Sequence, residues 1–412
     1  MRAAALALTQ PMTGENATAK LVGKLAEVDA PRRAEIVSAL GYRGDAGARS
    51  AAMKALDDAD AVVRVAAIGA VARGATSEGI AALLNMLNSR TGAEAKAIQD
   101  SLARMPGEAP LAAVAAALPK ASASARVVLL QILASRRDRA HVDPVLAAMT
   151  DADGAVRVAA IKALGELGEA KALPSLIDLV VTSKGGKEQT EGMQSIVAIC
   201  QRNSDAQKRA EPVLGALSQA SCEAKAVLIR SLSQLGGTEA LEAVIKETSG
   251  GDAAIADAAV RTLADWREVG AAGALLKISQ SSEKANHRVL ALRGYLRLVG
   301  LRSDRPAEET IGMYQEALKA AQRPDEKRLA LAGLSSVRTV GALKVVATYL
   351  EDETLAAEAA MAAVKIALPQ KESEQPLKGA EAAEILRKVA ASAKDPAIRN
   401  QASRYVEGAE KR

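Results

Sequence analysis

Very few residues of this chain belong to the types that carry out catalysis or bind metals. The sequence contains two histidines, His141 and His287, and two cysteines, Cys200 and Cys222. The histidines lie far apart in the sequence, so we do not expect them to share a metal ion or a catalytic triad. The segment Asp151-Ala-Asp153-Gly154 begins like a calcium-binding loop, but its glycine comes too early and no glutamate completes it. We therefore expect no catalytic residues, no cofactor and no metal site.

The sequence also lacks the motifs that mark common enzyme classes. There is no His-Glu-x-x-His, Cys-x-x-Cys or Gly-x-Ser-x-Gly, no phosphate-binding loop and no dinucleotide fingerprint. Cys200 and Cys222 are expected on neighbouring helices, too far apart for a disulfide, with Cys200 buried.

Two features of the sequence bear on where the protein works. No run of residues approaches the ~20 apolar positions that a membrane span needs. The first residues, Met1 to Pro11, have one basic residue and only a short apolar stretch, so they make no convincing signal peptide. We expect no membrane span, and a cytoplasmic protein by default or an exported one if the chain is part of a larger secreted protein.

The residues best suited to function are those that dominate binding energy, arginine and tryptophan. Positive charge and the only tryptophan concentrate within two adjacent segments, while Asp265 and Glu268 offset only part of that charge. The candidate partner-binding residues are Arg261, Trp266, Arg293, Arg297 and Arg302, with Arg230 and Lys162 at equivalent positions. Two alternatives stay open: the arginines could belong to an ordinary solvated face, and Trp266 could pack between neighbouring segments.

These residues belong to segments that recur along the chain. Octets of similar sequence start at Arg33, Arg64, Ala95, Arg126 and Arg157, 31 residues apart, and continue with wider gaps near Met193, Lys225, Ala256, Arg288, Lys327, Ala357 and Arg399. Places 4, 5 and 8 of an octet are apolar, which is one face of an α-helix. Place 7 is usually small, so neighbouring backbones can approach closely.

Each period also contains a second helical segment, such as 172–180, so one repeat holds two antiparallel helices of about 11–12 residues. Strand signals are absent. The core residues expected at octet places 4 and 5 are Ile68, Leu130, Ile161, Val197, Ile229, Val260 and Leu292. Asp60 and Asp153 precede octets and are expected to cap their helices.

The repeats predict one continuous all-α solenoid over residues 1–412, of about twelve helix pairs. Repeats are regular over 33–180 and irregular over 181–412. The wider gaps predict insertions at 182–192, 301–324 and 368–396, which we expect to be turns or lengthened helices. Within the last of these, 368–380 is expected to be mobile.

The segment Asp153-Gly-Ala-Val-Arg157-Val-Ala-Ala-Ile-Lys-Ala-Leu-Gly-Glu-Leu-Gly168 resembles the bacterial short HEAT repeat, and Asp60 to Ile68 resembles it too. The resemblance implies a HEAT-type α-solenoid. It also implies that the Asp before an octet and the Arg at its start pair between neighbouring repeats. Asp60/Arg64 and Asp153/Arg157 match this pattern, whereas Ala95 and Ala256 interrupt it.

The resemblance implies a non-catalytic scaffold that presents an extended surface, with a protein or peptide as the first choice of partner. In solenoids of this type the octet helices line the concave side. Place 6 of the octets holds Lys162, Arg230, Arg261 and Arg293, and place 10 holds Arg73, Arg104, Arg202 and Arg297, so a basic stripe could bind a polyanion instead. A third alternative is a HEAT-like enzyme such as a phycobilin lyase or a DNA glycosylase. We expect a monomer or part of a larger multidomain chain.

Overall fold

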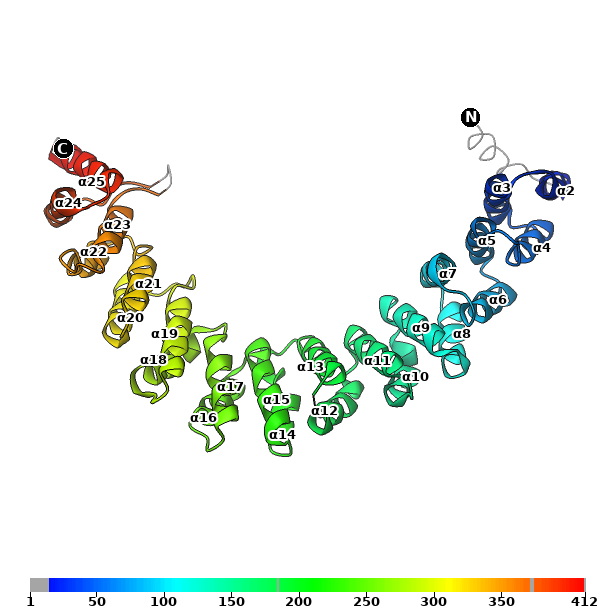
Figure 1. Ribbon diagram of the computed structural model, residues 1–412, viewed down its shortest axis with the longest axis horizontal. Coiled ribbons are helices and arrows are strands. Elements are labelled where there is room, and N and C mark those ends of the chain that lie inside the picture. The colour runs from blue at the N-terminus through cyan, green and yellow to red at the C-terminus, as the bar shows by residue number, and fades with distance from the viewer. Residues whose placement is uncertain (1–14, 184, 371–373, 411–412) are drawn as a thin grey trace. The chain divides into compact units, whose positions relative to one another are not determined.

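The computed structural model describes residues 15–183, 185–370 and 374–410. All regular elements in these ranges are helical, and no strand occurs among them. The helices form twelve pairs, divided equally between two compact units, Met1–Arg202 and Asn203–Arg412 (Figure 1). The prediction of an all-α fold of about twelve helix pairs is therefore confirmed. That the two units join into one continuous solenoid stays a prediction.

Each pair consists of a first helix and an octet helix, which is the helix that contains the octet. In the first unit the pairs are α2 (Glu15–Lys24) and α3 (Ala30–Arg43), α4 (Ala46–Ala55) and α5 (Ala61–Gly74), α6 (Ser77–Leu87) and α7 (Gly92–Arg104), α8 (Ala109–Ala117) and α9 (Ala123–Ser135), α10 (Val142–Ala147) and α11 (Gly154–Leu167), α12 (Leu173–Thr182) and α13 (Lys187–Cys200).

The second unit repeats the same order. Its pairs are α14 (Glu211–Leu217) and α15 (Cys222–Leu235), α16 (Thr238–Glu247) and α17 (Ala253–Ala264), α18 (Ala272–Ser281) and α19 (Ala285–Val299), α20 (Ala307–Ala320) and α21 (Pro324–Leu334), α22 (Val340–Ala347) and α23 (Ala356–Ala367), α24 (Ala380–Ser392) and α25 (Pro396–Glu410).

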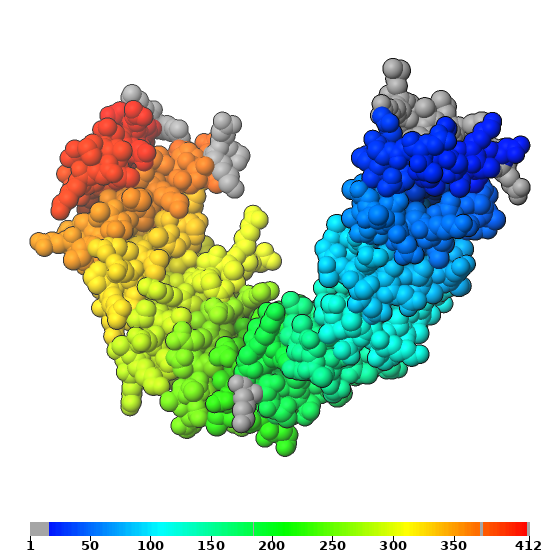
Figure 2. All heavy atoms as spheres, turned by 45° about the vertical axis from the view of Figure 1, so that its right-hand side comes forward, coloured from blue at the N-terminus to red at the C-terminus, as the bar shows by residue number. Residues whose placement is uncertain are grey.

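Within each unit the octet helices form one layer and the first helices another, with the core between them (Figure 1). Successive octet helices contact one another, as α15, α17 and α19 do, and each also contacts the first helix of its own pair. The space-filling view shows neighbouring repeats touching along each unit (Figure 2). All seven core residues expected at octet places 4 and 5 are buried, which confirms the helical phase that the repeat predicts.

Small residues let octet helices approach closely, as expected at place 7. A Cβ atom added at Gly294 in α19 would lie 2.7 Å from the Cα of Ala264 in α17. Ser195 in α13 makes the equivalent contact in the first unit, where its hydroxyl donates to the carbonyl of Ile161 in α11 at 2.8 Å. The octet start near Met193 made Ser195 place 3, so the structure moves the start of that octet four residues earlier, to Gln189. Backbone-to-backbone contact of this kind fixes how neighbouring repeats stack, because no side chain can rotate out of the way.

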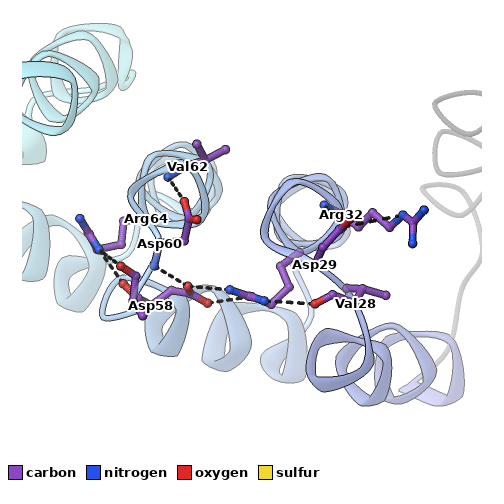
Figure 3. Close-up of polar contacts among 9 residues, drawn as sticks. Val28, Asp29, Arg32, Asp58, Asp60, Val62 and Arg64 are labelled. Carbon is purple, nitrogen blue, oxygen red and sulfur yellow. Dashed lines mark hydrogen bonds and ion pairs between the residues drawn. The ribbon is translucent and has the colours of Figure 1, made fainter.

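Arginines at the starts of octet helices join neighbouring repeats. Arg33 donates to both carboxylate oxygens of Asp58, at 3.1 and 3.2 Å, and Arg64 donates to Glu94 at 2.6 Å. Arg64 also donates to the carbonyl oxygen of Asp58 at 2.7 Å (Figure 3). These contacts join α3 to the loop before α5, and α5 to the first turn of α7. Burial and hydrogen bonding make such pairs more stabilising than exposed ion pairs.

The pairing partner differs from the one that the family resemblance implied. Asp60 accepts from the backbone N–H of Val62, so it caps its own helix (Figure 3). Asp153 caps its helix in the same way, because it accepts from the N–H groups of Ala155 and Val156. The capping prediction is confirmed, whereas the predicted Asp60/Arg64 and Asp153/Arg157 pairing is wrong. Aspartate and arginine do pair between neighbouring repeats, but through the aspartates two residues earlier: Asp58 pairs with Arg33, and Asp151 lies 2.7 Å from Arg126. Arg157 instead donates to Glu188 of the next repeat at 2.7 Å.

Two of the expected insertions contain whole helices. Residues 301–324 include α20 and residues 368–396 include α24, each the first helix of its pair, while residues 187–192 belong to α13. The described part of 368–380 is tied to its surroundings, because the N–H of Leu377 donates to the carbonyl of Ala367 at 2.9 Å and Arg338 donates to that of Gln375 at 2.9 Å. Residues 371–373 lie outside the described residues, and mobility of the segment stays a prediction.

Candidate functional site

Three of the predicted binding residues occupy the same place on successive octet helices. Arg230 lies on α15, Arg261 on α17 and Arg293 on α19, and the side chains of all three are exposed. Because these helices contact one another in sequence and the arginines share octet place 6, the three side chains lie in a row on one face of the second unit. We call Arg230, Arg261 and Arg293 the arginine row.

The members of the arginine row differ in their partners. The Nε of Arg261 lies 2.7 Å from a carboxylate oxygen of Asp257, one turn earlier on α17. The hydrogen bond from Arg261 lowers the pKa of Asp257, and burial partly opposes that effect. The guanidinium groups of Arg230 and Arg293 have no hydrogen bond or ion pair with any residue of the described ranges. The row therefore presents two free guanidinium groups and a third that is held by a single exposed ion pair.

Asp257 has a second neighbour in His287. The Nε2 of His287 lies 3.2 Å from the other carboxylate oxygen of Asp257, and the imidazole is buried between α17 and α19. The other histidine, His141, has its Nδ1 2.6 Å from Asp138. Each histidine is therefore engaged with one carboxylate in its own local setting, as their separation in the sequence predicted.

Trp266 does not belong to this surface, which corrects the hypothesis that it anchors a partner. Its side chain is 1% exposed. Helix α17 ends at Ala264, and the N–H of Trp266 donates to the carbonyl of Leu263 at 3.0 Å, so the chain turns back at this point. The ring thus enters the core of the repeat stack, where it cannot contact a bound partner.

Arg297 is also committed to the fold. Its guanidinium donates to the carbonyl of Ala264 at 2.8 Å and to that of Trp266, which are the free carbonyls at the end of α17. Arg202 does the same in the first unit, where it donates to the carbonyl of Leu167 at the end of α11 at 2.8 Å. Two of the four place-10 arginines, Arg202 and Arg297, thus cap the preceding octet helix, which satisfies carbonyls that the helix itself leaves unpaired. The other two do not: Arg73 donates to the hydroxyl of Tyr42 at 3.1 Å, and Arg104 lies 3.9 Å from Asp100 on its own helix.

The two remaining candidates lie outside the arginine row. Arg302 follows α19 in an exposed turn. Lys162 is on α11 of the first unit, where its Nζ lies 3.3 Å from Glu191. The structure therefore brings together three of the seven sequence-predicted residues.

The described ranges contain no metal-binding group of three or more histidine, cysteine, aspartate or glutamate side chains. The two cysteines are free thiols, as predicted. Cys200 is buried, which raises the pKa of its thiol to about 11, and Cys222 is exposed. Among the residues that the structure describes, no helix is both long and apolar enough to cross a membrane.

Sequence reasoning missed a groove on the same layer of the second unit. It lies between α23 and α25 and has a volume of about 540 Å³. Met361 projects into it with 55% of its surface exposed, and Lys365 and Arg404 line its other end. The signal in the sequence was the pair Met361 and Lys365, which are large residues one turn apart on α23, a helix that consists mostly of alanine.

Comparison with known proteins finds a family match for part of the chain. Residues 111–192, which begin within α8 and end within α13, match the family model described as HEAT repeats. No curated protein matches the chain in sequence.

Solved structures share the fold at low sequence identity. Kap121p bound to Nup53p matches with a TM-score of 0.56 and 10% identity, over 96% of this chain and 49% of that chain. A homology model of the full-length AP-3 complex matches with a TM-score of 0.52 and 9% identity, over 96% of this chain and 87% of that chain. Kap95p in its complex with RanGDP matches with a TM-score of 0.51 and 11% identity, over 100% of this chain and 67% of that chain. The chain spans about half the length of Kap121p, and at these identities the likeness establishes the fold.

Proposed function

We propose that this HEAT-repeat protein is a non-catalytic scaffold whose arginine row binds an acidic, extended segment of a protein partner. The observation that carries the proposal is the repeated exposure of Arg230, Arg261 and Arg293 at one octet place, two of them without a partner among the described residues. Leaving a guanidinium free costs nothing in water, so the row is available to a ligand without breaking buried contacts.

The spacing of the repeats indicates the form of the ligand. Neighbouring packed helices lie about 8–10 Å apart, so side chains at one octet place recur at about that distance. A polyproline-II segment rises about 3.1 Å per residue and has three residues per turn, so every third side chain lies on one side, about 9 Å from the last. An acidic residue at every third position of such a segment would therefore match the three arginines in turn.

Two further observations favour a protein segment over nucleic acid. Proteins that bind single strands stack bases on exposed aromatic rings, but the only tryptophan here is buried. The large hydrophobic residues exposed on the second unit are aliphatic: Val269, Leu301, Leu329 and Met361. Kap121p, which shares the fold, has been solved with the C-terminus of Cdc14p and with Nup53p, so this fold presents surfaces to protein segments in that case.

Charge reversal tests the proposal on the full chain. The probe is a fluorescein-labelled peptide with Asp-Pro-Ser repeated three times, measured by fluorescence anisotropy. We expect the Arg230→Glu/Arg293→Glu variant to bind at least about tenfold more weakly, because each reversed contact turns attraction into repulsion. The matched control is Lys246→Glu/Lys277→Glu, which makes the same change in net charge on exposed positions of α16 and α18 in the same unit.

Equal weakening in both variants would refute the proposal, because the attraction would then come from net charge alone. A single-stranded oligonucleotide of thymidines serves as the competing ligand. If it binds more tightly than the peptide and loses affinity only in the arginine variant, the row is a polyanion site and the proposed protein partner is wrong. Circular dichroism should show the same helicity in both variants, since the substituted side chains are exposed.

A further inference from the structure

Helices α23 and α25 are neighbouring octet helices near the C-terminal end of the chain (Figure 1). The groove between them is lined by a stripe of side chains from each helix. On α23, Met361 and Lys365 are one turn apart and share a face. On α25, Ile398, Gln401 and Arg404 follow one another at three-residue spacing and share a face in the same way. All five line the groove, with Leu368 at its edge.

Each stripe is apolar toward the start of its helix and cationic toward its end. Both α23 and α25 are octet helices and contact each other. The groove therefore has an apolar part formed by Met361 and Ile398, and a cationic part formed by Lys365 and Arg404. Of the residues that the structure describes, no acidic one lines it. Neither the ammonium group of Lys365 nor the guanidinium of Arg404 has an ion pair or hydrogen bond with another residue of the described ranges.

Exposure of Met361 is unusual for a residue in the middle of a helix that is otherwise rich in alanine. Its exposed fraction is 55%, whereas Ala360 and Ala362 on either side are buried. Methionine adapts its shape to apolar ligands, because it is unbranched and its thioether is polarisable. Exposed Leu329 lies on the preceding octet helix α21, which contacts α23, so large aliphatic groups occur on two neighbouring repeats.

From this arrangement we infer that the groove binds an extended peptide segment in which a large aliphatic residue is followed two positions later by an aspartate or glutamate. Four residues of helix rise about 6 Å, which is the separation along α23 of the Met361 and Lys365 positions. Two residues of an extended strand rise about 6.6 Å, and their side chains lie on the same side. The aliphatic side chain would therefore contact Met361 and Ile398 while the carboxylate reaches Lys365 and Arg404.

This site is separate from the arginine row, since it lies on different helices and requires an aliphatic group as well as an acid. It extends the proposed scaffold function, because the groove would select a partner by the order of its aliphatic and acidic residues and not by negative charge alone. The two proposals can fail independently, because each uses its own residues and its own probe.

Methyl NMR of the full chain, labelled at the methionine methyl groups, tests the inference. The probe is the peptide acetyl-Ser-Ser-Leu-Ser-Asp-Ser-Ser-amide, and the Met361 signal is assigned by its loss in Met361→Leu. We expect the peptide to shift the Met361 signal, and Lys365→Glu or Arg404→Glu to weaken binding by about tenfold. Lys394→Glu is the matched control, because Lys394 is exposed in the turn between α24 and α25 and does not line the groove.

Peptide variants separate the two parts of the groove. Replacing the leucine by serine should abolish the Met361 shift, and placing leucine and aspartate next to each other should weaken binding. An unchanged Met361 signal at millimolar peptide would overturn the inference, as would equal binding of a peptide with lysine in place of aspartate. The Arg230→Glu/Arg293→Glu variant should bind this peptide as the wild type does, so failure of the arginine row leaves this test intact.

Discussion

Replacing Gly294 with alanine should destabilise the second unit, although alanine is the better helix former. In an exposed helix the change from glycine to alanine stabilises by about 1 kcal/mol. At Gly294 the new Cβ would lie 2.7 Å from the Cα of Ala264 and 3.1 Å from its carbonyl oxygen. These are backbone atoms of α17, so α19 would have to move away.

Overpacking typically costs about 1–3 kcal/mol, and a contact of 2.7 Å with a backbone atom belongs to the upper part of that range, about 2–3 kcal/mol. After the gain of about 1 kcal/mol in helix propensity, the net loss should be about 1–2 kcal/mol. If the free energy of unfolding falls by about 2 kcal/mol per molar urea, the urea concentration at the midpoint of unfolding should fall by about 0.5–1 M. The tryptophan fluorescence of Trp266 is a local reporter, because the ring is buried and the Trp266 carbonyl accepts from Arg297 on α19.

Gly69→Ala is the matched control. The added Cβ would meet only the guanidinium of Arg73, at 3.9 Å, so the same substitution should leave the fold intact or slightly stabilise α5. Because Gly69 lies in the first unit, the transition reported by Trp266 should not change. A Gly294→Ala variant as stable as the wild type would refute the backbone contact between α17 and α19.

Other predictions concern capping, pH and thiol reactivity. Arg297→Ala should lower the stability reported by tryptophan fluorescence in urea by about 1–2 kcal/mol, because the last carbonyls of α17 lose a charged donor, and an unchanged midpoint would contradict this capping role. Glu94→Gln should lower the melting temperature at pH 7, and the difference from the wild type should shrink as the pH falls below about 4.3 and vanish below the lowered pKa of folded Glu94. The hydrogen bond from Arg64 lowers the pKa of Glu94 in the folded protein. The ion pair therefore stabilises the fold fully above the ordinary carboxyl pKa of about 4.3, and this stabilisation is lost as the pH falls through the pKa of folded Glu94. A difference in melting temperature that persists at low pH would exclude the ion pair as its cause. Iodoacetamide at pH 8 should label Cys222 alone by mass spectrometry, because Cys222 is exposed while burial raises the pKa of Cys200 to about 11, and equal labelling of both would show that Cys200 is accessible.

The octet pattern was sufficient to predict the helix pairs and their core. Helical phase follows from the apolar places, so Ile161 and Leu292 are buried as expected. Close approach at Gly294 followed from the small residue at place 7. Each of these features depends only on residues within one repeat and on its copy in the next, which is why periodicity alone reveals them.

The roles of long side chains could not be predicted in this way. Arg297 was predicted to bind a partner, but its guanidinium reaches the end of α17 in the neighbouring repeat. Trp266 was assigned to a surface because it follows a basic octet, whereas the turn after Ala264 directs it inward. Both outcomes depend on where the preceding helix ends, and the octet pattern does not contain that information.

The arginine row and the groove at Met361 differ in whether the sequence could predict them. The arginine row was predictable, because Arg230, Arg261 and Arg293 share one octet place. The groove at Met361 was not, because the octets at Ala357 and Arg399 are weak copies of the repeat and leave their register uncertain. Sequence periodicity therefore finds a site that repeats and misses a site that occurs once.

The most direct test of the scaffold proposal is whether the protein reads the spacing of acidic residues. Two labelled peptides of identical composition are compared by fluorescence anisotropy, one with Asp-Pro-Ser repeated three times and one with the three aspartates together at one end. If each arginine of the row binds one aspartate, the peptide with spaced aspartates should bind at least about fivefold more tightly than the peptide with clustered aspartates. The Arg230→Glu/Arg293→Glu variant should abolish this difference in affinity. Equal affinity of the two peptides for the wild type would contradict the account, because it would show that the surface responds only to the amount of negative charge.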